Sequence, residues 1–235
     1  MSEALKRMNL CFDLDGPIID VCDRYYRAYL ESLAGSEIKS EQILKKEDFW
    51  KLKQNRVSDL EISILSGQNI QDSKNSGDLR KALSFKTDYL ALDKIFDDVY
   101  KTFDYLKSQS INFFIVTLRR RSQLDYAIKQ FKLNKYLSNE KFFSRTDDQK
   151  SQNDIQEKYL LFASAINLLS LNPIETWMIG DSETDIHSAR LVRFGKIISI
   201  TRGIRSKEQL AVLRPDYLVS NLSEVVDLTM SVKAR

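Results

Sequence analysis

The sequence is poor in the residues that bind soft metals or supply imidazole chemistry. It has one histidine, His187, and two cysteines, Cys11 and Cys22, among 235 residues. A single imidazole excludes chemistry that needs several histidines. The two thiols are not accompanied by histidines or cysteines at the spacing of a zinc site. We therefore expect both cysteines to be buried apolar thiols and His187 to be structural.

Long apolar runs and a large charge of one sign are also absent. No stretch is long enough to span a membrane, and the N-terminus has no apolar signal segment. The formal net charge is +3, and basic residues are scattered except for Arg119-Arg120-Arg121, a run more typical of a solvated helix start. We expect a cytoplasmic protein without a membrane partner. The net charge is too small to argue for a nucleic-acid partner by itself, so we do not expect one, and the oligomeric state stays open.

The chain is organised around an apolar run, residues 9–12, that ends in Asp13, Asp15, Gly16 and Pro17. This pattern predicts a buried strand that delivers carboxylates to a turn. Side chains two residues apart in a strand share a face, so the two acids emerge together if the strand persists. Two such carboxylates repel each other unless a cation or a shared proton relieves them. An ordinary turn is the alternative.

Two kinds of sequence follow. Residues 18–91 are predicted to contain only helices and loops, with the clearest loop at 66–77 and a helix at about 78–90. Strands and helices then alternate, which predicts an α/β fold with a doubly wound parallel sheet. Because the helical part interrupts this alternation, we expect a core of residues 1–17 and 92–235 with an inserted all-α domain, residues 18–91.

Reactive side chains follow several of the predicted strands. Thr117 ends the strand expected at 111–117, and Asp181 and Asp185 follow the strand at 176–180. Lys158 lies at the head of the helix before that strand. Ligands of open parallel sheets bind beyond the carboxyl ends of the strands, where converging acids with one lysine and one threonine suit Mg²⁺-assisted phosphoryl transfer. Singly, each residue also fits a structural role.

The ordered set resembles the haloacid dehalogenase (HAD) superfamily. Four motifs match in order, namely Asp13-Leu-Asp15-Gly16, the strand ending in Thr117, Lys158, and Gly180-Asp181-Ser-Glu-Thr-Asp185. The resemblance covers nearly the whole chain. The helical insert is similar to a C1 cap of the phosphoglycolate phosphatase and β-phosphoglucomutase branch. Two positions depart from the pattern: Pro17 replaces a common threonine, and Leu118-Arg119 stands where many relatives have asparagine.

The resemblance implies catalytic roles for four residues. Asp13 would be the nucleophile that forms an aspartyl-phosphate, and Asp15 would protonate the leaving group and later deprotonate water. Lys158 and Thr117 would stabilise charge on the phosphoryl oxygens. An acid at position 15 favours phosphate esters over carbon–halogen bonds, because dehalogenases of this superfamily lack it.

The resemblance also implies a metal and a substrate site. Mg²⁺ would be held by Asp13, Asp181 and the backbone carbonyl of Asp15, with Asp185 orienting the metal shell. A carboxylate needs this help because it must approach a phosphate dianion. The predicted substrate-binding residues come from the first two motifs and from a cap loop at 52–58; they are Gly16, Leu118, Arg119, Lys53 and Arg56. A solvated basic turn is the alternative for the last two.

These expectations define a leading hypothesis and three competitors. The leading one is a Mg²⁺-dependent phosphatase acting on a small phosphorylated metabolite of the phosphoglycolate, sugar phosphate or nucleotide type. A sugar phosphomutase of the β-phosphoglucomutase type would use the same residues. A catalytically inactive HAD-like binding or regulatory protein has only Pro17 in its favour. A nucleic-acid end phosphatase depends on the pI of 8.7 and on Arg119 to Arg121.

Overall fold

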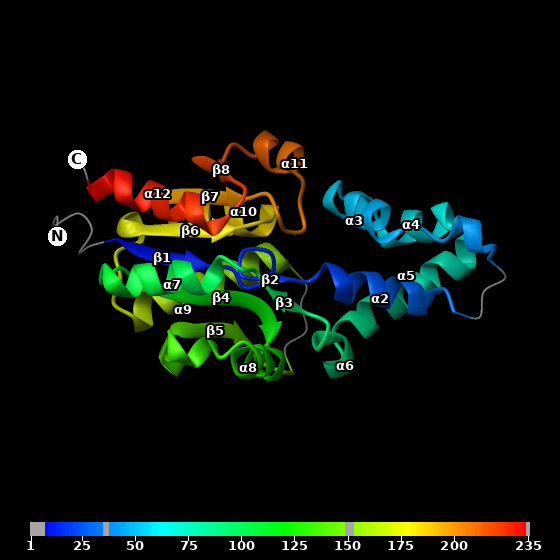
Figure 1. Ribbon diagram of the computed structural model, residues 1–235, viewed down its shortest axis with the longest axis horizontal. Coiled ribbons are helices and arrows are strands. Elements are labelled where there is room, and N and C mark those ends of the chain that lie inside the picture. The colour runs from blue at the N-terminus through cyan, green and yellow to red at the C-terminus, as the bar shows by residue number, and fades with distance from the viewer. Residues whose placement is uncertain (1–7, 35–37, 149–152, 234–235) are drawn as a thin grey trace.

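The computed structural model has two lobes, a sheet flanked by helices and a group of helices beyond one end of that sheet (Figure 1). It describes residues 8–34, 38–148 and 153–233. The first residues of the predicted core range, 1–7, therefore lie outside the described part, as do 234–235. No helix in the described part is long and apolar enough to cross a membrane.

The larger lobe is built on one parallel sheet. Its six strands are ordered β5-β4-β1-β6-β7-β8, and every adjacent pair is parallel. The strands are β1 (Asn9–Phe12), β4 (Asn112–Arg120), β5 (Phe142–Arg145), β6 (Thr176–Gly180), β7 (Lys196–Ile200) and β8 (Tyr217–Val219). The order confirms the predicted fold class. It also brings the carboxyl ends of β1, β4 and β6 together at the middle of the sheet.

Helices cover both faces of the sheet, which explains why its strands are continuous apolar runs. Leu10 and Phe12 of β1 pack in one apolar cluster, whereas Cys11 between them packs in the other, as expected for alternating side chains. The first cluster includes residues of α7 (Val99–Ser108), α8 (Arg121–Gln130) and α12 (Leu222–Lys233). The second includes residues of α9 (Asp154–Leu168), α10 (Glu183–Val192) and α11 (Lys207–Val212).

The smaller lobe lies beyond the carboxyl ends of the strands (Figure 1). Its helices are α2 (Cys22–Ser32), α3 (Lys46–Gln54), α4 (Asp59–Leu65), α5 (Ile70–Ser84) and α6 (Thr87–Leu90). Tyr29, Leu33, Phe49 and Ile62 form a separate apolar cluster within it. Short 3-10 helices complete the described elements of the chain, at 40–42, 133–135, 139–141 and 173–175.

The two chain crossings between the lobes form a small antiparallel pair. Strand β2 (Ile19–Asp20) pairs with β3 (Lys94–Ile95). The expectation that residues 18–91 contain no strand is therefore wrong at 19–20. A two-residue strand has no periodicity of its own, because it exists only through its partner on the other crossing. The limits of the inserted domain stay a prediction.

The predicted loop at 66–77 is wrong from Ile70 onward, where α5 begins. Asn69 is its N-cap and accepts the backbone N–H of Asp72. The serines and glycine that suggested a loop are the buried face of the helix, which packs closely on α2 and α4. Ser76, for example, donates its hydroxyl to the carbonyl of Ser32. Small residues allow close helix contact, and their composition imitates that of a loop.

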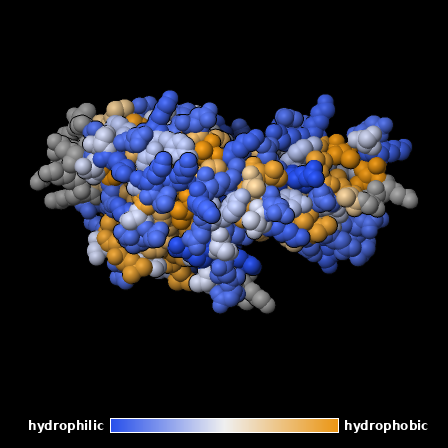
Figure 2. Space-filling model, turned by 60° about the horizontal axis from the view of Figure 1, so that its bottom comes forward, coloured by the Kyte–Doolittle hydropathy of each residue, from blue (hydrophilic) through white to orange (hydrophobic). Residues whose placement is uncertain are grey.

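The molecular surface mixes polar and apolar residues. On the face shown in Figure 2, hydrophobic patches on both lobes are surrounded by hydrophilic residues. Several exposed apolar side chains belong to the smaller lobe, among them Leu60, Ile64, Leu65 and Ile70 of α4 and α5. The two lobes contact each other where α3 ends, because Gln54 donates its side-chain amide to the carbonyl of Gly203 at 3.0 Å.

Candidate active site

Three carboxylates meet at the carboxyl ends of β1 and β6. Asp13 follows β1, and Asp181 and Asp185 come from the turn between β6 and α10; each offers an oxygen within 4.8 Å of the others. All three residues are buried. Two glycines allow the backbone to close around Asp181, because a Cβ at Gly16 or Gly203 would lie 2.2 or 1.9 Å from its side chain. Gly16 also has a φ of +98°, which favours glycine.

Backbone groups fix the two acids of the β6–α10 turn. Ser182 is the N-cap of α10, and one oxygen of Asp185 accepts the Ser182 hydroxyl at 2.7 Å and the N–H groups of residues 181 and 182 at 3.1 Å. One oxygen of Asp181 accepts the N–H of Ile204 at 2.5 Å. In each acid, the hydrogen bonds to one carboxylate oxygen fix the orientation of the side chain, so the other oxygen faces the cluster.

Lys158 lies between two of these acids. Its ammonium contacts Asp13 and is 2.8 Å from Asp185, and the residue is buried on the second turn of α9. Burial alone would lower its pKa, but the two adjacent carboxylates raise the pKa of Lys158 above its ordinary value. This lysine is therefore a permanent positive charge within the site.

One ammonium does not neutralise three buried carboxylates. Burial raises the pKa of Asp13 to about 7, with Lys158 opposing the change and Asp185 adding to it. Burial and the two neighbouring acids raise the pKa of Asp181 well above its ordinary value. The cluster therefore holds more negative charge than its surroundings compensate, which favours binding of a further cation or proton.

The side chain of Asp15 points to a different set of charges. The guanidinium of Arg119 lies 2.6 Å from one oxygen of Asp15, and that of Arg24 lies 3.1 Å from the other. The same two arginines bind Asp93, at 2.5 and 2.9 Å. Burial favours a higher pKa, but Arg119 and Arg24 hold the pKa of Asp15 below its ordinary value. Asp15 therefore does not share the charge surplus of the acid cluster.

This four-residue ion network joins the two lobes. Arg24 is on α2, Asp93 lies directly before β3, and Arg119 is near the end of β4, which continues to Arg120 beyond the predicted strand end at Thr117. Arg24, Asp93 and Arg119 are all buried, with at most 4% exposed surface. The expectation of a solvated helix start at 119–121 is thus wrong for Arg119, because β4 carries it inward before α8 begins.

An open cavity of about 610 Å³ contains most of the predicted site residues. The side chains that line it include Asp13, Asp15, Thr117, Leu118, Arg119, Lys158 and Asp181. Asp185 and Gly16 pack at its base against this group. The Thr117 hydroxyl accepts the N–H of Arg119 at 3.1 Å, which leaves its own hydrogen available to donate. Tyr25, Lys81 and Phe85 of the smaller lobe also line it.

Some residues of the site lack a signal in the sequence. Arg24 and Asp93 fit no motif, although an arginine on the buried stripe of α2 with Ala28 is a hint that it has a partner. Arg145 and Arg205 also line the cavity and were not predicted. Lys53 and Arg56, which were predicted to bind substrate, line a separate cavity of the smaller lobe.

Pro17 is accommodated without loss of backbone bonding. The turn is closed by the N–H groups of Gly16, Ile18 and Ile19, so the missing donor of a proline leaves no bond unmade. The carbonyl of Pro17 accepts a hydrogen bond from Arg202 at 2.5 Å, and Arg202 also pairs with Asp98 at 2.8 Å. The replacement of the usual threonine by Pro17 therefore leaves the turn intact.

Comparison with known proteins identifies the family. The sequence profile described as haloacid dehalogenase-like hydrolase matches residues 10–194. The chain belongs to this family. A pyrophosphatase PpaX from Bacillus mycoides is 22% identical over 95% of this chain and 97% of its own length. The predictions of the superfamily and of an enzyme are thereby confirmed.

Solved structures share the fold. One described as a predicted phosphatase from Clostridium acetobutylicum has a TM-score of 0.70 at 21% identity, over 96% of this chain and 99% of its own. A haloacid dehalogenase-like hydrolase from Streptococcus pneumoniae has a TM-score of 0.69 at 18% identity, over 95% and 98%. At such identities the likeness establishes the fold alone. The residue roles predicted from the motifs remain predictions.

The ion network predicts a difference between two arginines of the same helix. Arg24→Met leaves Asp93 and Asp15 short of a buried partner, so we expect the free energy of unfolding to fall by about 3–5 kcal/mol. Arg27→Met is the matched control, because the pair of Arg27 with Glu31 is exposed; it should cost about 0.5 kcal/mol or less. Urea unfolding followed by circular dichroism measures both. Equal losses would contradict a structural role for the network.

Proposed function

We propose that the protein is a Mg²⁺-dependent phosphatase that hydrolyses a small phosphorylated metabolite through an aspartyl-phosphate. The proposal is carried by one observation, the convergence of Asp13, Lys158 and Asp181 at the base of one cavity beyond the carboxyl ends of the strands. The PpaX relative is named a pyrophosphatase, which is a related phosphoryl-transfer activity. Membership of a hydrolase family supports transfer to water.

Asp13 is the nucleophile of the proposed reaction. One carboxylate oxygen attacks phosphorus, the bond to the leaving oxygen breaks, and the phosphoryl group becomes attached to Asp13. Lys158, which already contacts Asp13, stabilises negative charge on the transferred group, and the free hydrogen of Thr117 can donate to it. Water then attacks the aspartyl-phosphate, which releases inorganic phosphate and restores Asp13.

The residues of the cluster fit a divalent metal ion. Asp13, Asp181 and Asp185 offer carboxylate oxygens within 4.8 Å of one another, and hard oxygen donors suit Mg²⁺. Their surplus negative charge and the two glycines that close around Asp181 support the same assignment. Asp13 and Asp181 would hold the ion, with Asp185 beside them. The bound ion would supply positive charge that lets a carboxylate and a phosphate approach each other.

Asp15 handles the proton in this proposal. It lines the same cavity as Asp13, so it can reach the leaving oxygen and later the attacking water. Arg119 and Arg24 fix its carboxylate and keep its pKa below the ordinary value, so Asp15 is ionised here and must be released from these arginines before it can carry the proton for the leaving oxygen. Hydrolysis and the alternative phosphomutase reaction share all of these steps and differ only in the acceptor. The inactive-protein alternative loses its one argument, because the turn at Pro17 retains its bonds.

Removal of the nucleophile tests the proposal directly. Wild-type protein should release phosphate from p-nitrophenyl phosphate only with Mg²⁺, and Asp13→Asn should lower kcat by about 10³-fold or more. Asp125→Asn, at an exposed position of α8 that pairs with Arg121, is the control and should keep full activity. Circular dichroism checks that both variants are folded. Phosphate found on a sugar acceptor instead of in water would favour the phosphomutase.

The charge surplus predicts how stability depends on pH without metal. The folded-state pKa of Asp13 is about 7 against an ordinary value of 3.8, so the folded protein binds the extra proton between these pH values. Its contribution to stability is full below pH 4 and is lost as the pH rises toward 7. Asp181→Asn removes part of the repulsion, so in EDTA the variant should be more stable than wild type by a margin that grows from pH 5 to pH 8.

The difference in stability between wild type and Asp181→Asn is free of contributions from groups that titrate equally in both proteins. At pH 8 in EDTA we expect Asp181→Asn to raise Tm by roughly 2–4 °C, about 1 kcal/mol for a chain of this size. Mg²⁺ should raise the Tm of wild type and have a smaller effect on the variant. Differential scanning fluorimetry measures both changes. An equal Mg²⁺ shift in the two proteins would exclude Asp181 from the metal site.

A further inference from the structure

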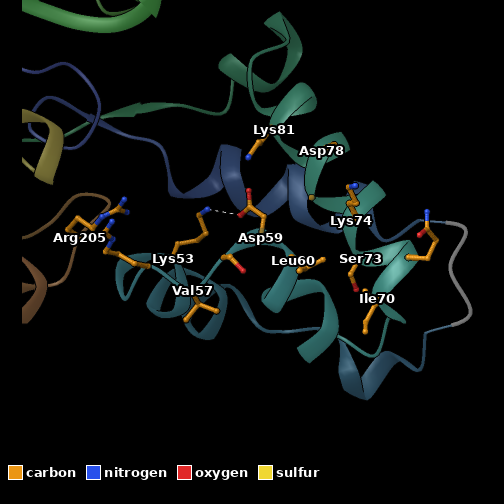
Figure 3. A pocket seen from close by; sticks show the side chains of 14 residues that line it. Lys53, Val57, Asp59, Leu60, Ile70, Ser73, Lys74, Asp78, Lys81 and Arg205 are labelled. Carbon is orange, nitrogen blue, oxygen red and sulfur yellow. Dashed lines mark hydrogen bonds and ion pairs between the residues drawn. The ribbon is translucent and has the colours of Figure 1, made fainter. Parts of the chain in front are cut away.

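A second cavity, of about 640 Å³, lies in the smaller lobe next to the active-site cavity. It is formed by the end of α3, the segment that follows it, and the facing sides of α4 and α5. Lys81 and Arg205 line both cavities, so the second begins where the first ends. Figure 3 shows Arg205 at the end near the core, Ile70 at the far end, and Lys53 with Asp59 between them. We call this space the distal cavity.

Basic residues outnumber acidic ones in the distal cavity. The basic residues in its lining are Lys53, Arg56, Lys74, Lys81 and Arg205, whereas the acidic ones are Asp59 and Asp78. Asp59 is already paired, with Lys53 at 2.7 Å and with the buried Arg80 at 2.8 Å. The charge balance of the cavity wall is therefore positive before any ligand enters.

The pairing differs among these cations. Arg56 and Arg205 share Glu183, at 3.4 and 2.6 Å. Lys74 and Lys81 have no acid within 4.0 Å among the residues that the structure describes, although both line the cavity. Both lysines are exposed, and Asp78 of the same lining lies within one helical turn of each, so it offsets part of their charge. The remaining positive charge is available to a ligand anion.

The two lysines follow the length of α5. They are seven residues apart, which places them on the same face of the helix about 10 Å apart along its axis. Lys81 is the nearer to the reacting groups, because it also lines the active-site cavity. Lys74 lies further out along the same wall (Figure 3). Val57, Leu60 and Ile70 provide apolar surface in the same lining.

We propose that the distal cavity binds a second anionic group of the substrate. The substrate would be an elongated phosphate monoester that carries a phosphate or a carboxylate at its other end. Lys81, and beyond it Lys74, would contact that group, while the apolar wall accommodates the chain between the two ends. This inference rests on the proposed phosphatase function. It extends that function by requiring a substrate with a second anionic group, separated from the reacting phosphate by more than two carbons.

A series of synthetic esters tests the inference. The probes are α,ω-alkanediol bisphosphates of three, six and ten carbons, the matching monophosphates, and the matching ω-carboxylates. The readout is the ratio of kcat/KM for each two-ended ester to that for its monophosphate, with allowance for the two equivalent ends of a bisphosphate. For wild type we expect this ratio to reach about tenfold or more at the longer lengths, as a charge-assisted contact supplies.

Variants assign the effect to the lysines. Lys81→Ala should lower the ratio about tenfold at all effective lengths, and Lys74→Ala should lower it only for the longer esters. Lys51→Ala is the matched control, since this exposed lysine of α3 lines neither cavity, and its ratio should equal that of wild type. A preference for one end group over the other supports the inference and identifies that group.

Three outcomes decide against parts of the proposal. A ratio near one for every length, with phosphatase activity intact, overturns the distal site alone. A ratio that Lys51→Ala lowers as much as Lys81→Ala also overturns it, because general charge would explain the preference. If neither these esters nor p-nitrophenyl phosphate is hydrolysed, the proposed function fails. Calorimetric titration of Asp13→Asn with the same esters then decides the distal site, since equal affinity for one-ended and two-ended esters overturns it.

Discussion

The charge imbalance between three carboxylates and one ammonium governs the centre of this protein. Asp13, Asp181 and Asp185 each offer an oxygen within 4.8 Å of the others, and among the described residues Lys158 is the cation paired with them. Such an arrangement survives in a folded protein only when the surrounding contacts over-determine it. The strand ends, the capping serine and the two glycines supply those contacts. In the proposed function, this unfavourable charge balance is what would favour binding of a cation, and with it of a phosphate.

A second group of charges, in contrast, has equal numbers of acids and bases. Asp15 and Asp93 face Arg24 and Arg119, so the two acids and two bases balance. Each acid contacts both arginines, so removal of either arginine leaves both acids with fewer ion-pair contacts inside the protein, which is destabilising. Because Arg24 and Asp93 belong to the two crossings between the lobes, movement of the helical lobe would disturb the carboxylate of Asp15. The position of that lobe and the geometry of Asp15, the proposed proton carrier, are therefore linked.

The sequence was most informative where functional residues lie close together in one short motif. The run at residues 9–15 and the motif containing Asp181 and Asp185 specify a strand, a turn and the acids that follow, so the core of the site could be anticipated. Arg24 and Asp93 could not, because a pairing between residues so far apart in sequence depends on how two lobes meet. The start of α5 was missed for a different reason. Its serines and glycine pack against neighbouring helices. Because close helix packing and loops both favour small residues, the composition of this helix resembles that of a loop.

The placement of Lys53 and Arg56 changes what their charges can do. The sequence predicted that Lys53 or Arg56 reaches the crevice, with a solvated basic turn as the alternative; in the structure both line the distal cavity, where Lys53 is bound to Asp59. Ion pairs of this kind fix the shape of a wall and leave little charge for a ligand. Among the residues that the structure describes, the lysines of the lining with no acid within 4.0 Å are Lys74 and Lys81 of α5. Selectivity in this lobe would then depend on a helix whose serine-rich face anchors it to α2 and α4 and whose lysines face the cavity.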